Sequence, residues 1–270
     1  MTKNYELNDG FGRTHARGAY PGYTDSTNGR AANGPRPVAF GGLLTNKILT
    51  GLPGADFARL LPHLEPVELA CDENLYFLGD PPEFVYFPES AVVSHLHVLS
   101  DGGTIEADMV GRDGLTGLSA VFNAHTPERW TKVTIGGSAL RVRADVMRQE
   151  FSLGGGVQQA FLKYASARLE QVSQRAVCNG LHSVEQRLCS WLLMLHDRAG
   201  DERLPLTHER IARHLGTRRA GITELATVLR SRGDISYSRG LIRIVNPQGL
   251  ETAACECYRV QSSQRARVIN

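Results

Sequence analysis

The sequence has no long apolar run and few cysteines. Its longest apolar stretch, around Trp191–Leu195, is far shorter than the roughly 18 residues that a membrane span needs. Met1–Gly10 contains no apolar segment of the kind found in secretory signals. The five cysteines are odd in number and scattered over 270 residues, which argues against a disulfide framework and for a reducing compartment. We therefore expect a cytoplasmic protein with no membrane partner.

Motifs of the common enzyme classes are also missing. The chain has no nucleophile elbow, no phosphate-binding glycine loop and no clustered metal-ligand spacing. Cys255-x-Cys257 is an isolated pair near the C-terminus, and we interpret it as two small buried or surface residues rather than as a redox motif. The sequence predicts a protein with no catalytic activity and no cofactor.

Branched aliphatic residues are scarce in residues 1–42, which are rich in Gly, Asn, Thr and Arg. Such a segment buries too little apolar surface to offset its ordering entropy, so we expect a disordered tail. From Val67 to Val142 the residue pattern changes to short runs of strand-forming residues separated by turn signals, which is typical of a sandwich or barrel. The clearest runs are Val85-Tyr86-Phe87, Val92-Val93, Leu96-His97-Val98, Ile105-Glu106-Ala107 and Val133-Thr134-Ile135.

A long helix follows, with an apolar seam at alternating steps of three and four residues. The seam consists of Leu162, Ala165, Leu169, Val172 and Ala176. A helix of about 20 residues is a rod of roughly 30 Å, and a narrow apolar stripe of this kind is typical of a coiled coil. A second copy of the chain across a two-fold axis is the simplest partner. Packing of the helix onto its own β domain is the alternative.

The region after this helix contains three helix-start signals. Ser183 and Gln186 form a capping box, Thr207 is placed to cap a short helix, and Thr217 is placed to cap the next one. Gly216 supplies the tight turn between the last two helices, and Gly233 ends the second. Two helices joined by a glycine turn predict a helix-turn-helix.

Alternating residues after the second helix predict a small β wing that turns at Ser238-Arg239-Gly240. Between Arg203 and Arg243 the chain has nine arginines against three acids, the composition of a polyanion-binding module. The residues expected to contact DNA are Thr217, Arg218, Arg219, Thr223, Arg239 and Arg243. Arginine at the start of a recognition helix can pair with guanine, whereas the wing arginines would meet phosphates. A structural helical hairpin with an ordinary solvated face is the alternative.

The order of these elements resembles the Crp/Fnr family of bacterial regulators over about residues 43–258. The segments that carry the resemblance are Val85-Tyr86-Phe87-Pro88, Val110-Gly111-Arg112-Asp113-Gly114, the stretch from Leu181 to Leu188, and the helix-turn-helix. The resemblance implies an α+β fold: a jelly-roll-like β-barrel sensor domain (43–150), a dimerisation helix (151–180), a winged helix-turn-helix (181–250) and a C-terminal tail (251–270). It also implies a homodimer on an inverted repeat of duplex DNA, with RNA polymerase as a further partner.

Departures from the family pattern bear on the effector. Gly117 and Arg129 match the phosphate cassette of members that bind cyclic AMP, but Leu118 replaces its acid and Trp130 follows the arginine. We therefore expect no cyclic AMP binding. Oxygen-sensing members hold an iron–sulfur cluster through N-terminal cysteines, and this chain has none before Cys71.

One further departure concerns the DNA site, and two alternative functions stay open. In the recognition helix, Arg219 matches the family's first arginine, whereas Ala220 and Glu224 replace the next two residues of the pattern, so the DNA site should differ. An effector-independent regulator with a vestigial barrel is one alternative. A signalling or scaffold protein whose winged helix binds protein is another.

One polar face of the β region is a candidate metal or pH-responsive patch. A two-residue turn at Asp101-Gly102 places His97 opposite Glu106 and His95 opposite Asp108, all four on one face. Imidazole and carboxylate are common ligands of zinc-type ions. Two solvated cross-strand pairs are the alternative, and a slip of one residue would break the constellation.

Overall fold

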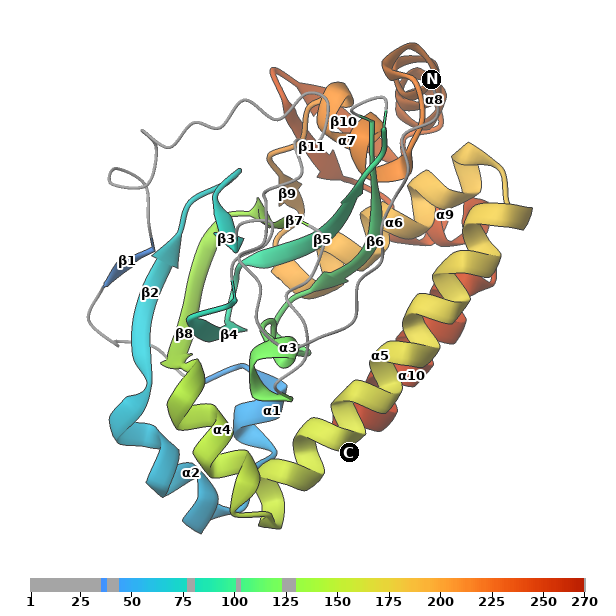
Figure 1. Ribbon diagram of the computed structural model, residues 1–270. Helices are drawn as coiled ribbons and strands as arrows, with labels where there is room; N and C mark the ends of the chain where they lie inside the picture. Colours follow the sequence, from blue (N-terminus) through green and yellow to red (C-terminus); the bar gives the residue numbers. More distant parts are fainter. Residues whose placement is uncertain (1–34, 38–43, 77–80, 101–102, 123–129, 270) are drawn as a thin grey trace, which may run out of the picture.

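The structure, a computed structural model, describes residues 35–37, 44–76, 81–100, 103–122 and 130–269 (Figure 1). The expected disordered tail, 1–42, lies outside these residues except for 35–37. There, β1 (Arg36–Pro37) pairs with β2, so this part of the tail is an ordered strand. No helix among the described residues combines the length and apolarity that crossing a membrane requires.

The N-terminal domain is built on two four-stranded antiparallel sheets. One sheet has the order β1-β2-β8-β4, and the other has the order β3-β7-β5-β6. Their remaining strands are β2 (Glu65–Leu69), β3 (Asn74–Tyr76), β4 (Phe84–Pro88), β5 (Val92–Val98), β6 (Thr104–Val110), β7 (Trp130–Ile135) and β8 (Gly137–Arg143). All five predicted runs fall in these strands. Among the described strands no ladder joins the two sheets, so the β-rich domain is confirmed and its closure into a barrel is not.

Two apolar clusters hold this domain together. Val67, Tyr86 and Val133 belong to the cluster between the sheets. β2 exposes Glu68 between two buried residues, whereas β4 and β5 are buried on both faces over most of their length. Phe87 and Phe161 lie in a second cluster, which fixes the surrounding helices to the first sheet. These helices are α1 (Lys47–Thr50), α2 (Gly54–Leu60), the 3-10 helix η2 (Leu61–His63), α3 (Leu118–Val121) and α4 (Ala144–Ser152).

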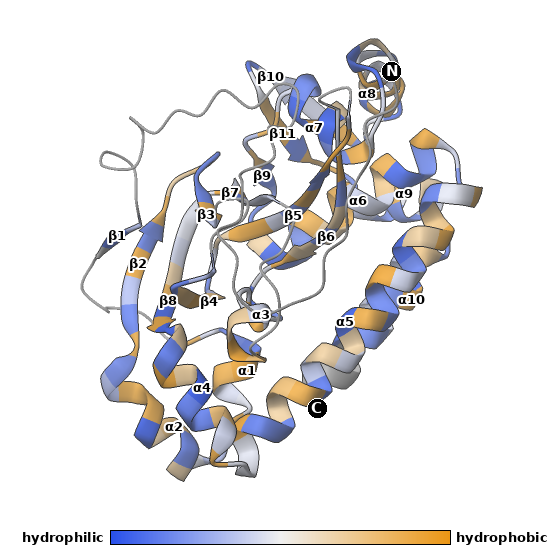
Figure 2. Cartoon of the chain, viewed as in Figure 1, coloured by the Kyte–Doolittle hydropathy of each residue, from blue (hydrophilic) through white to orange (hydrophobic). Residues whose placement is uncertain are grey.

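The long predicted helix is α5 (Gly155–Leu181), which runs as a rod along one side of the molecule (Figure 1). α6 (Val184–Ala199) follows it and begins with the predicted capping box, in which Ser183 and Gln186 exchange both hydrogen bonds. Figure 2 shows apolar residues along the visible side of α5, where no other helix covers it in this view.

The C-terminal domain has the predicted winged helix-turn-helix order. Its elements are β9 (Arg203–Leu204), α7 (His208–Leu215), α8 (Arg219–Ser231), β10 (Ile235–Ser238), β11 (Leu241–Ile244) and α9 (Pro247–Ala253). Their apolar core is continuous with Val92, Met109 and Ile135 of the second sheet. The helix-turn-helix is therefore packed against the N-terminal domain.

The expected C-terminal tail is largely helical. After α9, residues Cys257–Ile269 form α10, which packs along α5 (Figure 1). This helix was not predicted, because the apolar pattern of 251–270 is weak and the helix depends on its contacts with α5 and α6.

Candidate nucleic-acid interface

The helix-turn-helix is formed by local signals that the structure largely confirms. The hydroxyl of Thr207 accepts the backbone N–H of Arg210 at 3.2 Å and so caps α7. Gly216 ends that helix in the left-handed region, at a φ of 60°. Its absent side chain also matters, because a Cβ there would stand 3.0 Å from Ile105 of β6.

The cap predicted for the next helix is wrong by one residue. The N-cap of α8 is Arg218, whose side chain makes no capping bond, and Thr217 lies before it. The helix therefore begins one residue later than expected, and its first N–H groups keep no side-chain acceptor. Arg218 and Arg219 stand exposed at this helix start, where the unsatisfied N–H groups favour an anion.

α8 buries one face and presents the other to solvent. Ile222, Ala226 and Leu229 are buried in the domain core. Thr223 lies on the exposed face, donates its hydroxyl to the carbonyl of Arg219 at 3.1 Å, and sits 3.0 Å from Nδ1 of His208. Thr223 is thus positioned one turn along the same face as the two arginines.

His208 is a residue at this face that the sequence did not single out. Its ring stacks on Tyr237 of the wing, with the centroids 4.3 Å apart. Burial and then the nearby Arg219 lower the pKa of His208 below its usual 6.5. His208 therefore joins the recognition helix to the wing as a neutral ring at pH 7.

The wing has the predicted turn. Ser238 pairs with Leu241, and Arg239 and Gly240 both have positive φ, 48° and 79°, as a two-residue hairpin turn requires. Arg239 is exposed at the tip. Arg243 points outward as expected, but it pairs with Glu202 at 3.2 Å.

The predicted dimer seam lies uncovered on α5. Leu162 is 53% exposed, Leu169 72% and Val172 41%, while Ala176 is exposed and Ala165 half-buried. The helix buries a different set of residues against the rest of the chain. That set is Val157, Phe161, Tyr164, Gln171, Arg175 and Cys178. The alternative of a seam packed on its own β domain is therefore wrong.

Of the two residues proposed to bind an effector, the structure describes Gly117. Gly117 precedes α3 with a φ of 102°, and a Cβ there would come within 2.7 Å of the Tyr76 hydroxyl. Leu118 is partly buried and packs against the helical apolar cluster. Tyr76 and Tyr86 fill the nearby space between the sheets, with ring centroids 5.9 Å apart. Arg129 lies outside the described residues.

The proposed metal patch is corrected by the strand register. His95 does face Asp108, but His97 pairs with Ile105 and Leu96 with Glu106. The connection between β5 and β6 is longer by one residue than the predicted turn, and a bulge after His95 restores the register. His97 is consequently exposed while Glu106 is buried, so the four side chains do not converge.

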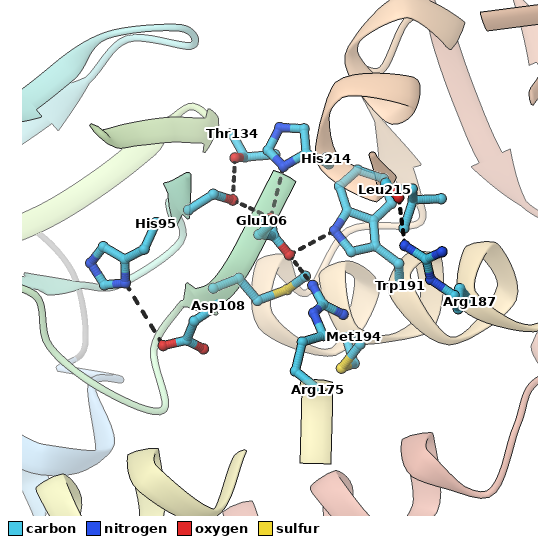
Figure 3. Close-up of polar contacts among 12 residues, drawn as sticks. His95, Glu106, Asp108, Thr134, Arg175, Arg187, Trp191, Met194, His214 and Leu215 are labelled. Atoms are coloured by element: carbon cyan, nitrogen blue, oxygen red, sulfur yellow. Dashed lines mark hydrogen bonds and ion pairs between the residues drawn. The ribbon is translucent and has the colours of Figure 1, made fainter. Parts of the chain in front are cut away.

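Asp108 has an ion-pair partner that the sequence did not indicate. Its carboxylate pairs with Arg168 of α5. The same carboxylate lies 3.7 Å from Nδ1 of His95 (Figure 3). Burial lowers the pKa of Arg168 to about 9, which leaves the guanidinium charged at neutral pH. This pair links the second sheet to the buried face of α5.

Glu106 is the centre of a larger polar network (Figure 3). It is 1% exposed and receives hydrogen bonds from elements of both domains. The donors are Ser94 Oγ of β5 at 2.6 Å, Nδ1 of His214 in α7 at 2.7 Å, Nε1 of Trp191 in α6 at 2.9 Å, and Arg175 of α5. The carboxylate thus connects the sheet, the long helix and the first helix of the helix-turn-helix.

The ionisation of Glu106 follows from these partners. Burial alone would raise its pKa, but Arg175, together with the bonds from His214 and Ser94, holds the pKa below the usual 4.5. A buried carboxylate that stays charged at neutral pH needs such a full set of donors.

Comparisons with known proteins agree with this architecture. Residues 186–253 match the Crp-like helix-turn-helix domain. The global nitrogen regulator of Synechocystis sp. is 24% identical over 208 residues, which cover 73% of this chain and 92% of that protein.

Two solved structures are similar in fold. A transcriptional regulator of the Crp/Fnr family from Eubacterium rectale has 19% identity and a TM-score of 0.61, covering 76% of this chain and 96% of its own. FixK2 from Bradyrhizobium japonicum has 18% identity and a TM-score of 0.61, covering 71% of this chain and 98% of its own. The matched domain shows that the chain carries a Crp-like helix-turn-helix, and the solved structures show that it has the fold of these Crp/Fnr-type proteins, as its motifs predicted.

Proposed function

We propose that the protein binds an inverted repeat of duplex DNA as a homodimer, in the cytoplasm, with one α8 helix in each major groove. The observation that carries the proposal is the exposed face formed by Arg218, Arg219 and Thr223, with Arg239 of the wing beyond it. The uncovered seam of α5 supports the dimer. Two-fold symmetry then sets the half-sites about one helical turn, ~34 Å, apart.

The arginines divide into two roles by their place in the fold. Arg219, in the first turn of α8, is suited to a bidentate contact with guanine worth ~1–3 kcal/mol of discrimination. Arg239 at the wing tip is suited to phosphate, which positions the domain without reading sequence. Arg243 would have to leave or share Glu202 to join it, so its contribution should be smaller.

We further propose that cyclic AMP is not the effector. Leu118 packs into an apolar cluster where the family's binding members carry an acid, and the nearby space between the sheets is filled by Tyr76 and Tyr86. The measurement is calorimetric titration of the full chain with cyclic AMP, for which we expect no micromolar isotherm. A clear isotherm would overturn this part of the proposal alone.

The test of DNA binding uses fragments selected from genomic DNA by the purified protein. If each subunit neutralises three to five phosphates, affinity should fall ~10³–10⁵-fold between 50 and 200 mM salt. Affinity that is insensitive to salt would contradict the proposal and favour a protein-binding winged helix.

Two substitutions separate the proposed roles. Arg219→Ala should reduce the preference for the selected site over scrambled DNA, whereas Arg239→Ala should weaken both DNAs alike. Arg143→Ala is the control, since Arg143 is exposed on β8 and pairs with Asp145 in the N-terminal domain. Equal loss of preference in the two DNA-binding variants would contradict the assignment.

A further inference from the structure

Three of the five cysteines meet at one place, although the sequence separates them. Cys178 lies near the end of α5, 77 residues before Cys255 in the link between α9 and α10. Cys257, the first residue of α10, completes a small separate cluster in which all three are buried. Cys255-x-Cys257 is therefore not the isolated pair that its sequence context indicated.

A histidine completes the group. His182 follows Cys178 by four residues, so the two side chains share one face at the end of α5. The Nδ1 atom of His182 lies 3.5 Å from the sulfur of Cys257, and the sulfurs of Cys178 and Cys255 are also 3.5 Å apart. All four possible ligand atoms lie within 4.8 Å of one another.

These distances suit a single tetrahedral ion. With bonds of about 2.3 Å to sulfur and about 2.0 Å to nitrogen, the ligand atoms of a zinc ion lie about 3.5 to 3.8 Å apart. The observed separations, from 3.5 Å for the two closest pairs to the 4.8 Å limit, bracket these values. A disulfide would use only two of the sulfurs and would give no role to the imidazole.

The surroundings supply the contacts that metal ligands need. The other ring nitrogen of His182, Nε2, lies 3.3 Å from a carboxylate oxygen of Glu256, the partner that fixes the ring of a zinc-bound histidine. Gln174 donates its amide to the sulfur of Cys257 at 3.0 Å. The hydroxyl oxygen of Ser190 lies 3.2 Å from the sulfur of Cys255. The amide donated by Gln174 favours the thiolate form of Cys257, which is the form that binds metal.

We propose that Cys178, His182, Cys255 and Cys257 form a Cys3His site for one zinc-type divalent ion. The ion would fasten the start of α10 to the end of α5, at the junction where α5 passes into α6. Because thiolates and imidazole are the ligands, the site would prefer zinc or cobalt to magnesium or calcium. A closed set of four protein ligands is typical of a structural rather than a catalytic ion.

The experiment titrates cobalt into the full chain, stripped of metal by a chelator and kept reduced and free of oxygen. We expect one cobalt per chain, with the intense visible absorption of tetrahedral thiolate coordination, and stoichiometric displacement by zinc. Cys255→Ser and Cys257→Ser should lose this absorption, whereas Cys71→Ser, at an exposed cysteine outside the group, should keep it.

A milder variant guards against loss of folding. Glu256 is exposed, and Glu256→Gln should weaken metal binding about 10–100-fold without affecting circular dichroism. Glu251→Gln, on α9, is its matched control and should bind metal as the unaltered chain does.

Several outcomes would overturn the site. They are absent cobalt absorption in the unaltered chain, absorption that survives both cysteine substitutions, and unchanged affinity in Glu256→Gln. Free thiols should also be counted in the chain as isolated, after denaturation without reductant. A count of three rather than five would mean that two of the cysteines form a disulfide and would contradict the metal site.

Discussion

The two faces of α5 differ in both composition and cover. The face turned toward the rest of the chain carries Arg168, Arg175 and Cys178, each with a partner from another element. The other face carries Leu162, Leu169 and Val172, which are exposed. Beyond Tyr164 the inner face thus buries polar side chains such as Gln171 and Arg175, whereas the outer face leaves apolar side chains exposed. The outer face is the one that we propose to pack against a second copy, while the inner face connects the domains.

Among changes on the outer face, we expect Leu169→Glu to weaken the proposed dimer most. Burying Leu169 contributes about 1.5–3 kcal/mol per subunit, so a dimer should lose about 3–6 kcal/mol, and the charge should add repulsion. We expect monomers with little DNA affinity in sedimentation experiments. Lys163→Glu is the control, since Lys163 is exposed on α5 outside the seam. An intact dimer for Leu169→Glu would place the interface elsewhere.

The inner network is most strongly broken by Glu106→Ala. The substitution leaves Arg175 buried without its carboxylate, which should lower the free energy of unfolding by about 3–5 kcal/mol. Urea unfolding measures the loss. Glu65→Ala removes a surface pair with Arg141 and should cost about 0–1 kcal/mol. Similar losses for the two variants would mean that the network contributes no more than a surface pair.

Acid should weaken the Glu106 network on the inner face of α5. The pKa of Glu106 is below 4.5 in the folded chain, so its stabilising contribution is fully present above 4.5. The contribution is lost as the pH falls through the lower folded-state pKa, because the unfolded chain then binds the extra proton. Unfolding free energies measured below pH 4.5 should fall more steeply for the unaltered chain than for Glu106→Gln. Parallel curves would contradict this.

The smallest expected effect tests whether the two faces are independent. Ser183→Ala removes the capping box at the start of α6, directly after α5, and should cost about 1 kcal/mol of stability. The dimer dissociation constant, measured by sedimentation, should not change. Glu170→Ala, on the surface of α5, is the neutral comparison. A weaker dimer in Ser183→Ala alone would show that the junction and the seam are coupled.

Local signals predicted the DNA-binding domain because local chemistry forms it. Thr207, Gly216 and the Ser183 box act on neighbouring backbone groups, and the structure bears them out. Thr217 misled because a cap can move by one residue when the turn geometry changes. The seam of α5 was visible for the same reason, since its period is a property of one helix.

The remaining features depend on contacts between distant residues. Glu106 meets residues from β5, α5, α6 and α7, and no spacing in the sequence links them. The register of β5 and β6 depends on a bulge that shifts His97 away from Glu106. The cysteine and histidine group was missed because α10 itself was missed. Two cysteines next to a weak helix carried too little pattern.

The hydrogen bonds from His214 and Trp191 to Glu106 join the helix-turn-helix to the β sheets, so binding at either part can be coupled to binding at the other. Suppose that a small molecule bound to the sheets, and DNA bound to α8, each distinguish the docked arrangement from one in which these bonds are open. Each ligand must then change the affinity of the other by the same factor. A candidate effector can therefore be tested from the DNA side, by whether its binding constant shifts when operator DNA is present.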